Sequence, residues 1–324
     1  KAYYDAITGW FRRRHGWQIR PEWVLHTTGV IPALSAVIKA LTQPGDKVLI
    51  QTPVYNHFFT SIQNSGCQAA ESPLVYRDNT YTIDFDDLER KAADPAVKLM
   101  LLCNPHNPAG RVWTPAELRR IGELCLRHDV VVVADEIHCE LVMPGFSYTP
   151  FASLCEEFER SSVTCTSPSK AFNLAGLQVA NIFAADAALR ARIGHSLQIN
   201  ETGEIGPFAI EALIAAYDEG AEWLDALNEY LHDNYRFLRE YFDRNLPQYP
   251  VLPLEGTYLV WVDCRASGLT SDELETKLLE EAKLRINPGS IYGEAGRDFI
   301  RLNIACPRKL LAEGLDRLRK VLKR

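Results

Sequence analysis

Four short polar segments of this sequence carry side chains that can transfer protons or form covalent bonds. Each begins within two residues of the end of an apolar run: Thr52-Pro53-Val54-Tyr55, Cys103-Asn104-Pro105-His106-Asn107-Pro108-Ala109-Gly110, Asp135-Glu136-Ile137-His138 and Ser167-Pro168-Ser169-Lys170. A lysine amine is a nucleophile and a base, whereas carboxylates and imidazoles exchange protons. The segments therefore hold the residue types of a catalytic site, provided that the fold brings them together.

The apolar runs around these segments predict buried strands. Val, Ile and Leu dominate successive positions at 47–50, 99–102, 130–134, 163–165 and 179–184, as in strands covered on both faces. Helical patterns fall between them, at 53–64, 85–93, 114–128 and 151–159. This alternation predicts an α/β fold with a mostly parallel sheet. Since ligands bind beyond the carboxyl ends of such strands, we expect the four polar segments to meet in one crevice.

The pattern changes after Pro207. Long amphipathic helices are predicted at 209–217 and 221–245, short strands at 258–263 and 299–303, and a last helix at 307–324. We therefore expect a large domain at 1–220 and a smaller α+β C-terminal domain at 221–324. The chain begins with Lys1 rather than Met, already inside a helical pattern, so we expect a native N-terminal segment to be missing here.

Composition narrows the classes of partner. The 324 residues are 47% hydrophobic and 24% charged, with a formal net charge of −7, as in a globular protein with a large core. Without a basic excess, nucleic acid is not expected as a partner. No apolar stretch approaches the length of a membrane span, and no signal peptide is visible, so no membrane association is expected.

Cysteine usage suits a reducing cytoplasm. Eight cysteines are scattered without a C-x-x-C pair. No metal site is expected, because the cluster of Glu136, His138, Cys139 and Glu140 lacks a second ligand pair at suitable spacing. The Gly-x-Ser-x-Gly and Gly-x-Gly-x-x-Gly signatures are both absent.

Six motifs occur in order along the chain. They are Thr28-Gly29-Val30, Pro53-Val54-Tyr55, Asn107-Pro108-Ala109-Gly110, Asp135-Glu136-Ile137-His138, Ser167-Pro168-Ser169-Lys170 with Ala171-Phe172-Asn173, and Arg301-Leu302-Asn303. In this order they resemble the motifs of the fold-type-I pyridoxal 5'-phosphate (PLP) enzymes, specifically aminotransferase classes I and II and their cystathionine β-lyase branch. The resemblance implies the three-layer aspartate-aminotransferase fold, PLP as cofactor, a small amino acid as substrate and a homodimer with a shared active site.

The resemblance implies a role for each reactive residue. Lys170 would be the catalytic residue, holding PLP as a Schiff base and then moving protons at the substrate Cα. Asp135 would pair with the pyridine nitrogen and keep it protonated. Asn107 and His138 would hydrogen-bond the phenolic oxygen of the cofactor. The structural alternatives are a solvated lysine, a helix-capping aspartate, a simple Asn-Pro turn and a structural histidine.

The remaining binding residues are also implied by the resemblance. Tyr55 would stack on the pyridine ring, although it could also be a core tyrosine. Arg301 would bind the substrate α-carboxylate through its fork of donors, with a surface salt bridge as the alternative. The phosphate would lie at a helix N-terminus, on backbone N–H groups after a glycine and on two hydroxyls. Those phosphate ligands are Gly29, Val30, Ile31, Ser167 and Ser169.

Two departures from the common pattern favour the lyase branch. His138 stands where many aminotransferases have tyrosine, and Gln178 stands where many have a phosphate-binding arginine. The family also keeps an N-terminal tyrosine that reaches the phosphate of the neighbouring subunit, and no residue here matches it. We therefore expect a carbon-sulfur β-lyase that cleaves cystathionine or cysteine-type amino acids. A PLP-dependent aminotransferase and a PLP-binding regulatory protein with little turnover remain alternatives.

Overall fold

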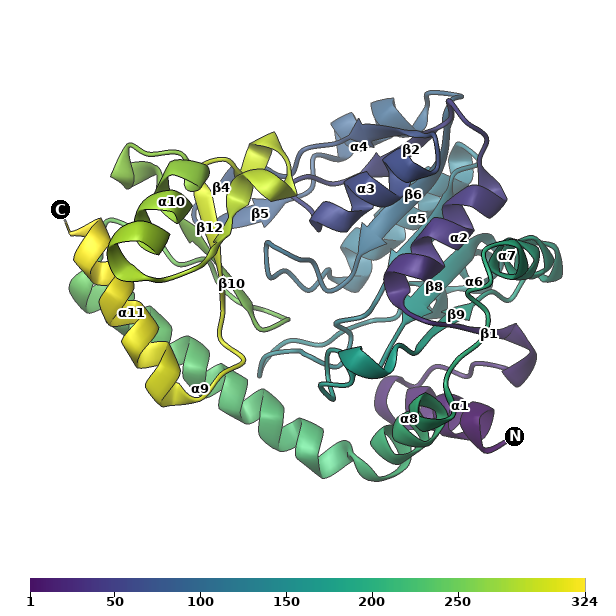
Figure 1. Cartoon of the computed structure of the whole chain (residues 1–324). Helices are drawn as coiled ribbons and strands as arrows, with labels where there is room; N and C mark the ends of the chain where they lie inside the picture. The colour runs from purple at the N-terminus through teal and green to yellow at the C-terminus, as the bar shows by residue number, and fades with distance from the viewer. Residues whose placement is uncertain (324) are drawn as a thin grey trace.

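The computed structural model describes residues 1–323, and the largest of its sheets has seven strands (Figure 1). The strand order is β1-β9-β8-β7-β6-β2-β3, and only β9 runs antiparallel to its neighbours within this sheet. The prediction of a mostly parallel sheet is confirmed. The strands are β1 (Val24–Thr27), β2 (Lys47–Ile50), β3 (Gln68–Glu71), β6 (Val97–Cys103), β7 (Val131–Asp135), β8 (Ser162–Thr166) and β9 (Ala180–Phe183).

Successive side chains of the central strands point to opposite faces of the sheet, and both faces are buried. Leu99 and Leu101 of β6 pack in one core cluster, whereas Met100 and Leu102 pack in another. The first cluster includes α2 (Val30–Leu41), α3 (Asn56–Asn64) and α7 (Ala187–Ile199), and the second includes α4 (Phe85–Ala92), α5 (Pro115–Arg127) and α6 (Glu156–Ser161). Helices therefore cover both faces, which gives the predicted three layers.

The second part of the chain forms a three-stranded antiparallel sheet, in the order β10-β12-β11. Its strands are β10 (Leu259–Asp263), β11 (Asn287–Pro288) and β12 (Phe299–Asn303), and its helices are α10 (Ser271–Ala282) and α11 (Arg308–Leu322). Figure 1 shows α9 (Ala221–Asn245) running from α8 (Pro207–Glu219) to α11. One core cluster extends from α1 (Ala2–His15) to α11, so the division at residue 220 stays a prediction.

Local sequence misplaced or missed several elements. Helix α3 begins at Asn56 rather than at 53, and the predicted helix at 151–159 is split into a 3-10 turn (Phe151–Leu154) and α6. The edge strands β1 and β3 were not predicted because their short sequences mix polar and apolar residues. The hairpin β4 (Val75–Arg77) and β5 (Thr80–Thr82), α7 and α10 were also missed. Arg324, the end of the predicted last helix, lies outside the described residues.

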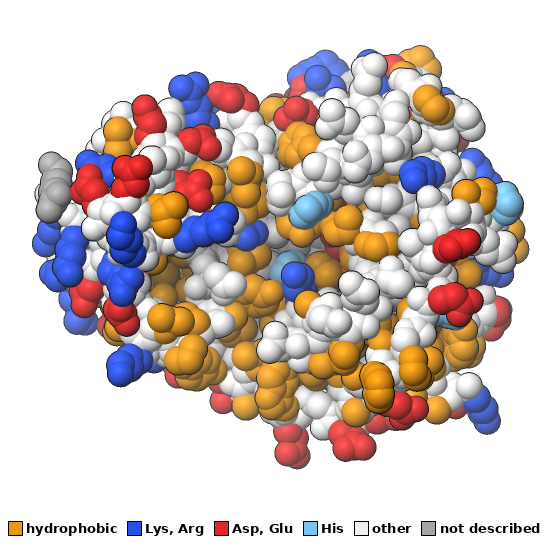
Figure 2. Space-filling view, in the orientation of Figure 1, with side chains coloured by type: hydrophobic (Ala, Val, Ile, Leu, Met, Phe, Trp, Pro, Cys, Tyr) orange, Lys and Arg blue, Asp and Glu red, His pale blue; other side chains and the backbone are white. Residues whose placement is uncertain are grey.

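Within residues 1–323, no helix combines the length and the apolar character needed to cross a bilayer. In Figure 2, hydrophobic side chains gather along the lower edge of the face shown, over α8 and α9. Phe208, at the start of α8, is 80% exposed, and Trp223 of α9 is 50% exposed.

Candidate active site

A cavity of about 390 Å³ lies where the carboxyl ends of the central strands meet the second sheet. It is bounded by the N-terminus of α2, the loops after β6 and β8, the end of β7, and β12. It brings together all but one of the residues predicted for the site: Gly29, Val30, Ile31, Tyr55, Asn107, Asp135, His138, Ser169, Lys170 and Arg301. Ser167 does not line it.

Lys170 and Asp135 approach the same cavity from neighbouring strands. Asp135 is the last residue of β7, and Lys170 follows β8 in a turn closed by the bond from the Phe172 N–H to the Pro168 carbonyl, 2.9 Å long. Because β7 and β8 are parallel neighbours, their carboxyl ends deliver both side chains to one place. The structure thus provides an amine and a carboxyl that face a common space.

The Asp135 carboxyl is short of partners. Its side chain is buried, and the hydrogen bond found for it is donated by the Ile137 N–H, 3.2 Å from Oδ1. Burial raises its pKa to about 7, while the Ile137 N–H and the charge of Lys170 act in the opposite direction. A buried carboxyl of this kind is stabilised as an anion by a cationic partner in the cavity, such as a protonated nitrogen heterocycle.

His138 is held neutral in the cavity wall. Burial lowers its pKa to about 3, and the positive charges of Lys170 and Arg301 lower it further. Its Nδ1 has no hydrogen-bond partner within the described residues, and its ring lies edge-on to Tyr258 with centroids 5.8 Å apart. A neutral imidazole carries one N–H donor and one acceptor, so His138 can bond an oxygen in the cavity without adding charge.

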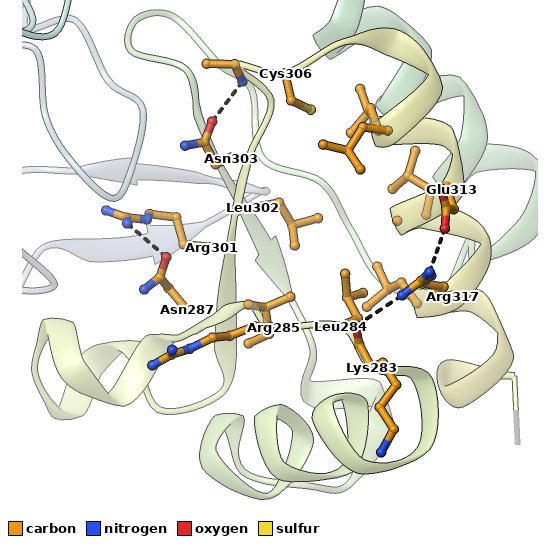
Figure 3. Close-up of a pocket in the computed structure, with 17 residues that line it drawn as sticks. Lys283, Leu284, Arg285, Asn287, Arg301, Leu302, Asn303, Cys306, Glu313 and Arg317 are labelled. Atoms are coloured by element: carbon orange, nitrogen blue, oxygen red, sulfur yellow. Dashed lines mark hydrogen bonds and ion pairs between the residues drawn. The ribbon is translucent and has the colours of Figure 1, made fainter. Parts of the chain in front are cut away.

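Arg301 projects from β12 without a carboxylate partner among the described residues. Its Nη1 donates to Asn107 Oδ1 and its Nη2 to Asn287 Oδ1, both at 3.0 Å, and Nε has no partner within residues 1–323. Figure 3 shows Arg301 and Asn287 joined in this way. The guanidinium also lies 5.0 Å from the ring centroid of Tyr292. Two amides thus fix its plane while its charge remains free for an anion from outside the chain.

The N-terminus of α2 forms the anion-binding end of the cavity. Gly29 is its N-cap, and the N–H groups of Val30 and Ile31 are at the helix start, where intrahelical acceptors are lacking. A Cβ on Gly29 would lie 3.3 Å from Pro32 Cδ, which is a tight contact. Gln178 also lines this cavity. The cavity therefore offers the backbone donors at the start of α2 and the side-chain amide of Gln178.

The two predicted hydroxyls have different positions. Ser169 lines the cavity, whereas the Ser167 hydroxyl donates to the Val179 carbonyl at 2.6 Å and accepts from the Ser169 N–H at 3.0 Å. These bonds do not test the phosphate contact expected of Ser167, which stays a prediction. The Ser167 hydroxyl also fixes the turn that carries Ser169 and Lys170, because a buried hydroxyl bonds the nearest backbone groups.

Tyr55 is the N-cap of α3 and lines the cavity, half-buried. Burial raises its pKa to about 12, and the charge of Asp135 contributes in the same direction. The phenol is therefore neutral near pH 7, and its ring can pack on a planar ligand.

Sequence reasoning missed two residues that shape the site. Tyr258 lines the cavity beside His138, and Asn287 sits opposite Arg301 in the β11–β12 register. Asn287 gives no local signal, since β11 spans only two residues and its pairing joins positions 14 apart. Tyr258 is the first residue of the strand predicted at 258–263 and directly precedes β10, and this position at a strand end was the signal that could have found it.

These residues fit the PLP that the resemblance implies. The buried Asp135 carboxyl needs a cation, the unpaired His138 Nδ1 needs a partner, and the start of α2 can bind a phosphate. Lys170 supplies the amine to which an aldehyde could be attached. The donor set thus matches an aromatic aldehyde with a basic ring nitrogen and an anionic tail.

Comparisons of sequence and of structure with known proteins point to the same family. Residues 1–318 match the family described as aminotransferase class I and II. The chain is 43% identical to cystathionine beta-lyase PatB of Bacillus subtilis over 318 residues, covering 98% of this chain and 82% of that protein. It is 35% identical to protein MalY of Escherichia coli over 317 residues, covering 96% and 79%. The structure of cystalysin from Treponema denticola, which contains PLP, superposes with a TM-score of 0.98 at 36% identity, covering 99% of this chain and 82% of that chain.

Proposed function

Because this chain belongs to the aminotransferase class I and II family, we propose that it is a PLP-dependent carbon-sulfur β-lyase acting on cystathionine or cysteine-type amino acids. The products are a thiol, pyruvate and ammonia. The observation that carries the proposal is the shared cavity of Lys170, Asp135 and an Arg301 without an acidic partner among the described residues. The relatives that are named cystathionine beta-lyases span nearly the whole chain.

Each residue has a defined task in this reaction. Bound PLP supplies an electron sink for negative charge at the substrate Cα. Arg301 binds the substrate α-carboxylate, held in plane by Asn107 and Asn287. Lys170 takes the proton from Cα, and Asp135 holds a proton on the ring nitrogen.

The phenolic oxygen of the cofactor and its phosphate have separate partners. His138, neutral in the cavity wall, offers one ring N–H to the oxygen, and Asn107 offers its side-chain amide. Val30, Ile31 and Ser169 bind the phosphate together with the positive end of the α2 dipole. Tyr55 covers the ring. These roles follow from position in the cavity and from donor chemistry.

The lyase and the aminotransferase are distinguished by the fate of the carbon-sulfur bond. Purified protein is incubated with cystathionine and no 2-oxo acid, and pyruvate, ammonia and free thiol are measured. Pyruvate released in equal amount with thiol over many turnovers supports the lyase. Activity that requires an added 2-oxo acid identifies an aminotransferase, and a bound cofactor without turnover of either kind identifies a PLP-binding regulatory protein.

Assembly and compartment are part of the same proposal. A homodimer with a shared active site is supported by the exposed apolar side chains Ile199 and Phe208, which are 68% and 80% exposed in the single chain. A reducing cytoplasm is supported by eight free cysteines, six of them buried.

A further inference from the structure

A buried polar network lies behind the turn that carries His138. The turn follows β7 and contains Glu136 and Glu140, both buried carboxylic acids that do not line the cavity. His138 lies between them in sequence, and its ring faces the cavity. Two buried acids on one turn are costly unless each is bonded, so their partners show what holds the turn.

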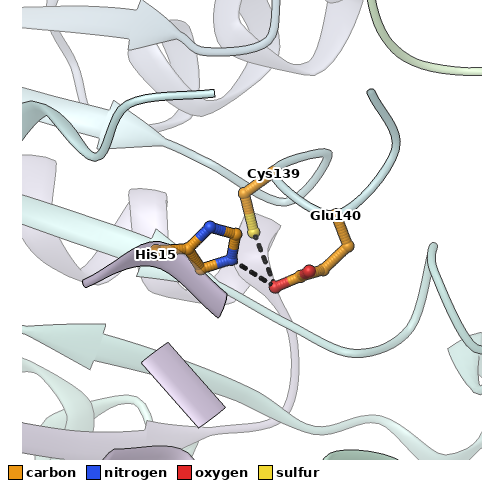
Figure 4. Close-up of side chains that lie close together, drawn as sticks. All are labelled: His15, Cys139 and Glu140. Atoms are coloured by element: carbon orange, nitrogen blue, oxygen red, sulfur yellow. Dashed lines mark hydrogen bonds and ion pairs between the residues drawn. The ribbon is translucent and has the colours of Figure 1, made fainter. Parts of the chain in front are cut away.

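Glu140 is bonded by side chains of α1. Its Oε1 accepts a hydrogen bond from Trp10 Nε1 at 2.6 Å and lies 2.7 Å from His15 Nε2. The Cys139 thiol points to the same oxygen at 3.7 Å, as Figure 4 shows. The backbone carbonyl of Glu140 accepts from Asn228 Nδ2 at 2.9 Å, which adds a contact from α9. The end of the turn is therefore fixed from two helices.

The geometry of His15, Cys139 and Glu140 is that of hydrogen bonds rather than that of a metal site. Their potential ligand atoms lie within 4.8 Å of one another. Two nitrogen or oxygen ligands of a tetrahedral zinc ion, however, lie about 3.3 Å apart. The 2.7 Å separation of His15 Nε2 and Glu140 Oε1 is shorter than this and fits a hydrogen bond.

Glu136 is bonded on the other side of the turn. Its Oε1 accepts from Asn104 Nδ2 at 3.1 Å and from the Phe151 N–H at 2.9 Å, and Oε2 accepts from the Tyr148 hydroxyl. The ring of Tyr148 lies edge-on to His15, with centroids 5.0 Å apart. This ring contact links the hydrogen bonds of Glu136 to those of Glu140. We call the linked residues the turn clamp: Trp10, His15, Glu136, Glu140 and Tyr148.

On the basis of the proposed function, we infer that the turn clamp positions Asp135 and His138 against the cofactor and acts on the reaction only through them. The residues on both sides of His138 are held by α1, by the loop after β6 and by the segment at 148–151. A displaced reactive group costs up to about 100-fold in rate, so a loosened turn lowers turnover while leaving the carboxylate-binding Arg301 in place.

The test compares Glu140→Ala with Glu140→Gln in the PLP-loaded protein. Alanine removes the acceptor of Trp10 and His15, whereas glutamine keeps an oxygen in its place. We expect Glu140→Ala to lower kcat by about 10- to 100-fold, with KM changed less than about threefold, and to shift the pH midpoint of the cofactor's visible absorption band. In Glu140→Gln we expect most of the wild-type kcat and most of the wild-type pH midpoint to be retained. Tyr148→Phe, which deletes only the hydroxyl bonded to Glu136, shifts the midpoint in the same direction by a smaller amount.

A double-mutant cycle separates positioning from general stability. If Glu140 acts through the turn, Glu140→Ala causes a smaller spectral shift and a smaller loss of kcat in a His138→Asn background than in the wild type, because only its effect through Asp135 is left. The matched control is Glu156→Ala, whose exposed side chain pairs with Arg160 on α6, and it should have wild-type values. Effects that add fully in the double mutant, or a wild-type spectrum and kcat in both Glu140→Ala and Tyr148→Phe, overturn the inference.

The spectral readout also separates this inference from the proposed lyase activity. The absorption band of bound PLP can be measured whether or not the enzyme cleaves the carbon-sulfur bond. A shifted midpoint in the variants of a protein that releases no pyruvate would contradict the lyase and still support the positioning role.

Discussion

Replacing Asp135 by asparagine should have opposite effects on the stability of the cofactor-free protein and on the activity of the loaded enzyme. The carboxyl is buried, and its pKa is raised from 3.8 to about 7, chiefly by burial. In a folded protein without a cationic ligand, the ionised form is therefore disfavoured. A raised carboxyl pKa contributes stability that is present below the unfolded pKa and is lost as pH rises toward the folded pKa.

The size of this effect follows from the two pKa values. The difference between 3.8 and about 7 corresponds to on the order of 4 kcal/mol at high pH, of which roughly 2 kcal/mol develops between pH 5 and pH 7. The Asp135→Asn variant lacks this titration. The cofactor-free variant should therefore gain stability relative to the cofactor-free wild type as pH rises from 5 to 8, because only the wild type must ionise a buried carboxyl at position 135.

Urea unfolding of both cofactor-free proteins at pH 5 and pH 8 measures this difference. Glu136, whose pKa is also raised to about 7, is present in both proteins and cancels in the comparison. With PLP bound, the same variant should lose about 1,000-fold in kcat, since a charge interaction worth about 4 kcal/mol with the ring nitrogen is removed. Equal pH dependence of stability in the two proteins, or near-normal turnover of the variant, would refute the reasoning.

Three further predictions concern binding and assembly. Arg301→Lys should raise KM by about 10- to 100-fold in steady-state assays with little change in PLP affinity, because lysine lacks the planar fork of donors that binds a carboxylate while also bonding Asn107 and Asn287. An unchanged KM would contradict the assignment. Gln178→Arg should tighten PLP binding by about tenfold in equilibrium dialysis, since it adds a charged donor to the cavity wall; weaker binding would place the phosphate elsewhere. Phe208→Glu should shift the protein toward the monomer in light scattering, because an exposed phenyl ring is replaced by a charge; a dimer of undiminished stability would move the interface to another surface.

The site could be predicted to a large extent because its chemistry lies at strand ends. Asp135 and Lys170 follow apolar runs that sequence periodicity identifies, and parallel strands deliver their carboxyl ends to one edge. The positions of Ser167 and Asn287 depend instead on contacts between distant segments. The Ser167 hydroxyl bonds Val179 of the next strand region, and Asn287 meets Arg301 only through sheet pairing. Neither contact can be predicted from the residues next to Ser167 or Asn287 in the sequence.

Local sequence likewise predicts only some of the strands. The central strands are buried on both faces and read as continuous apolar runs, so β2, β6, β7 and β8 were predicted. The edge strands β1 and β3 have polar residues and gain their structure from one neighbour each. Their pairing is a property of the assembled sheet, and short polar sequences do not specify it.

The most direct measurement of the central claim is mass spectrometry of the protein after borohydride reduction in the presence of PLP. We expect one pyridoxyl-phosphate adduct, on the peptide that contains Lys170, and we expect Lys170→Ala to lack both the adduct and the visible absorption band. An adduct on another lysine, or a band that survives in Lys170→Ala, would contradict the account.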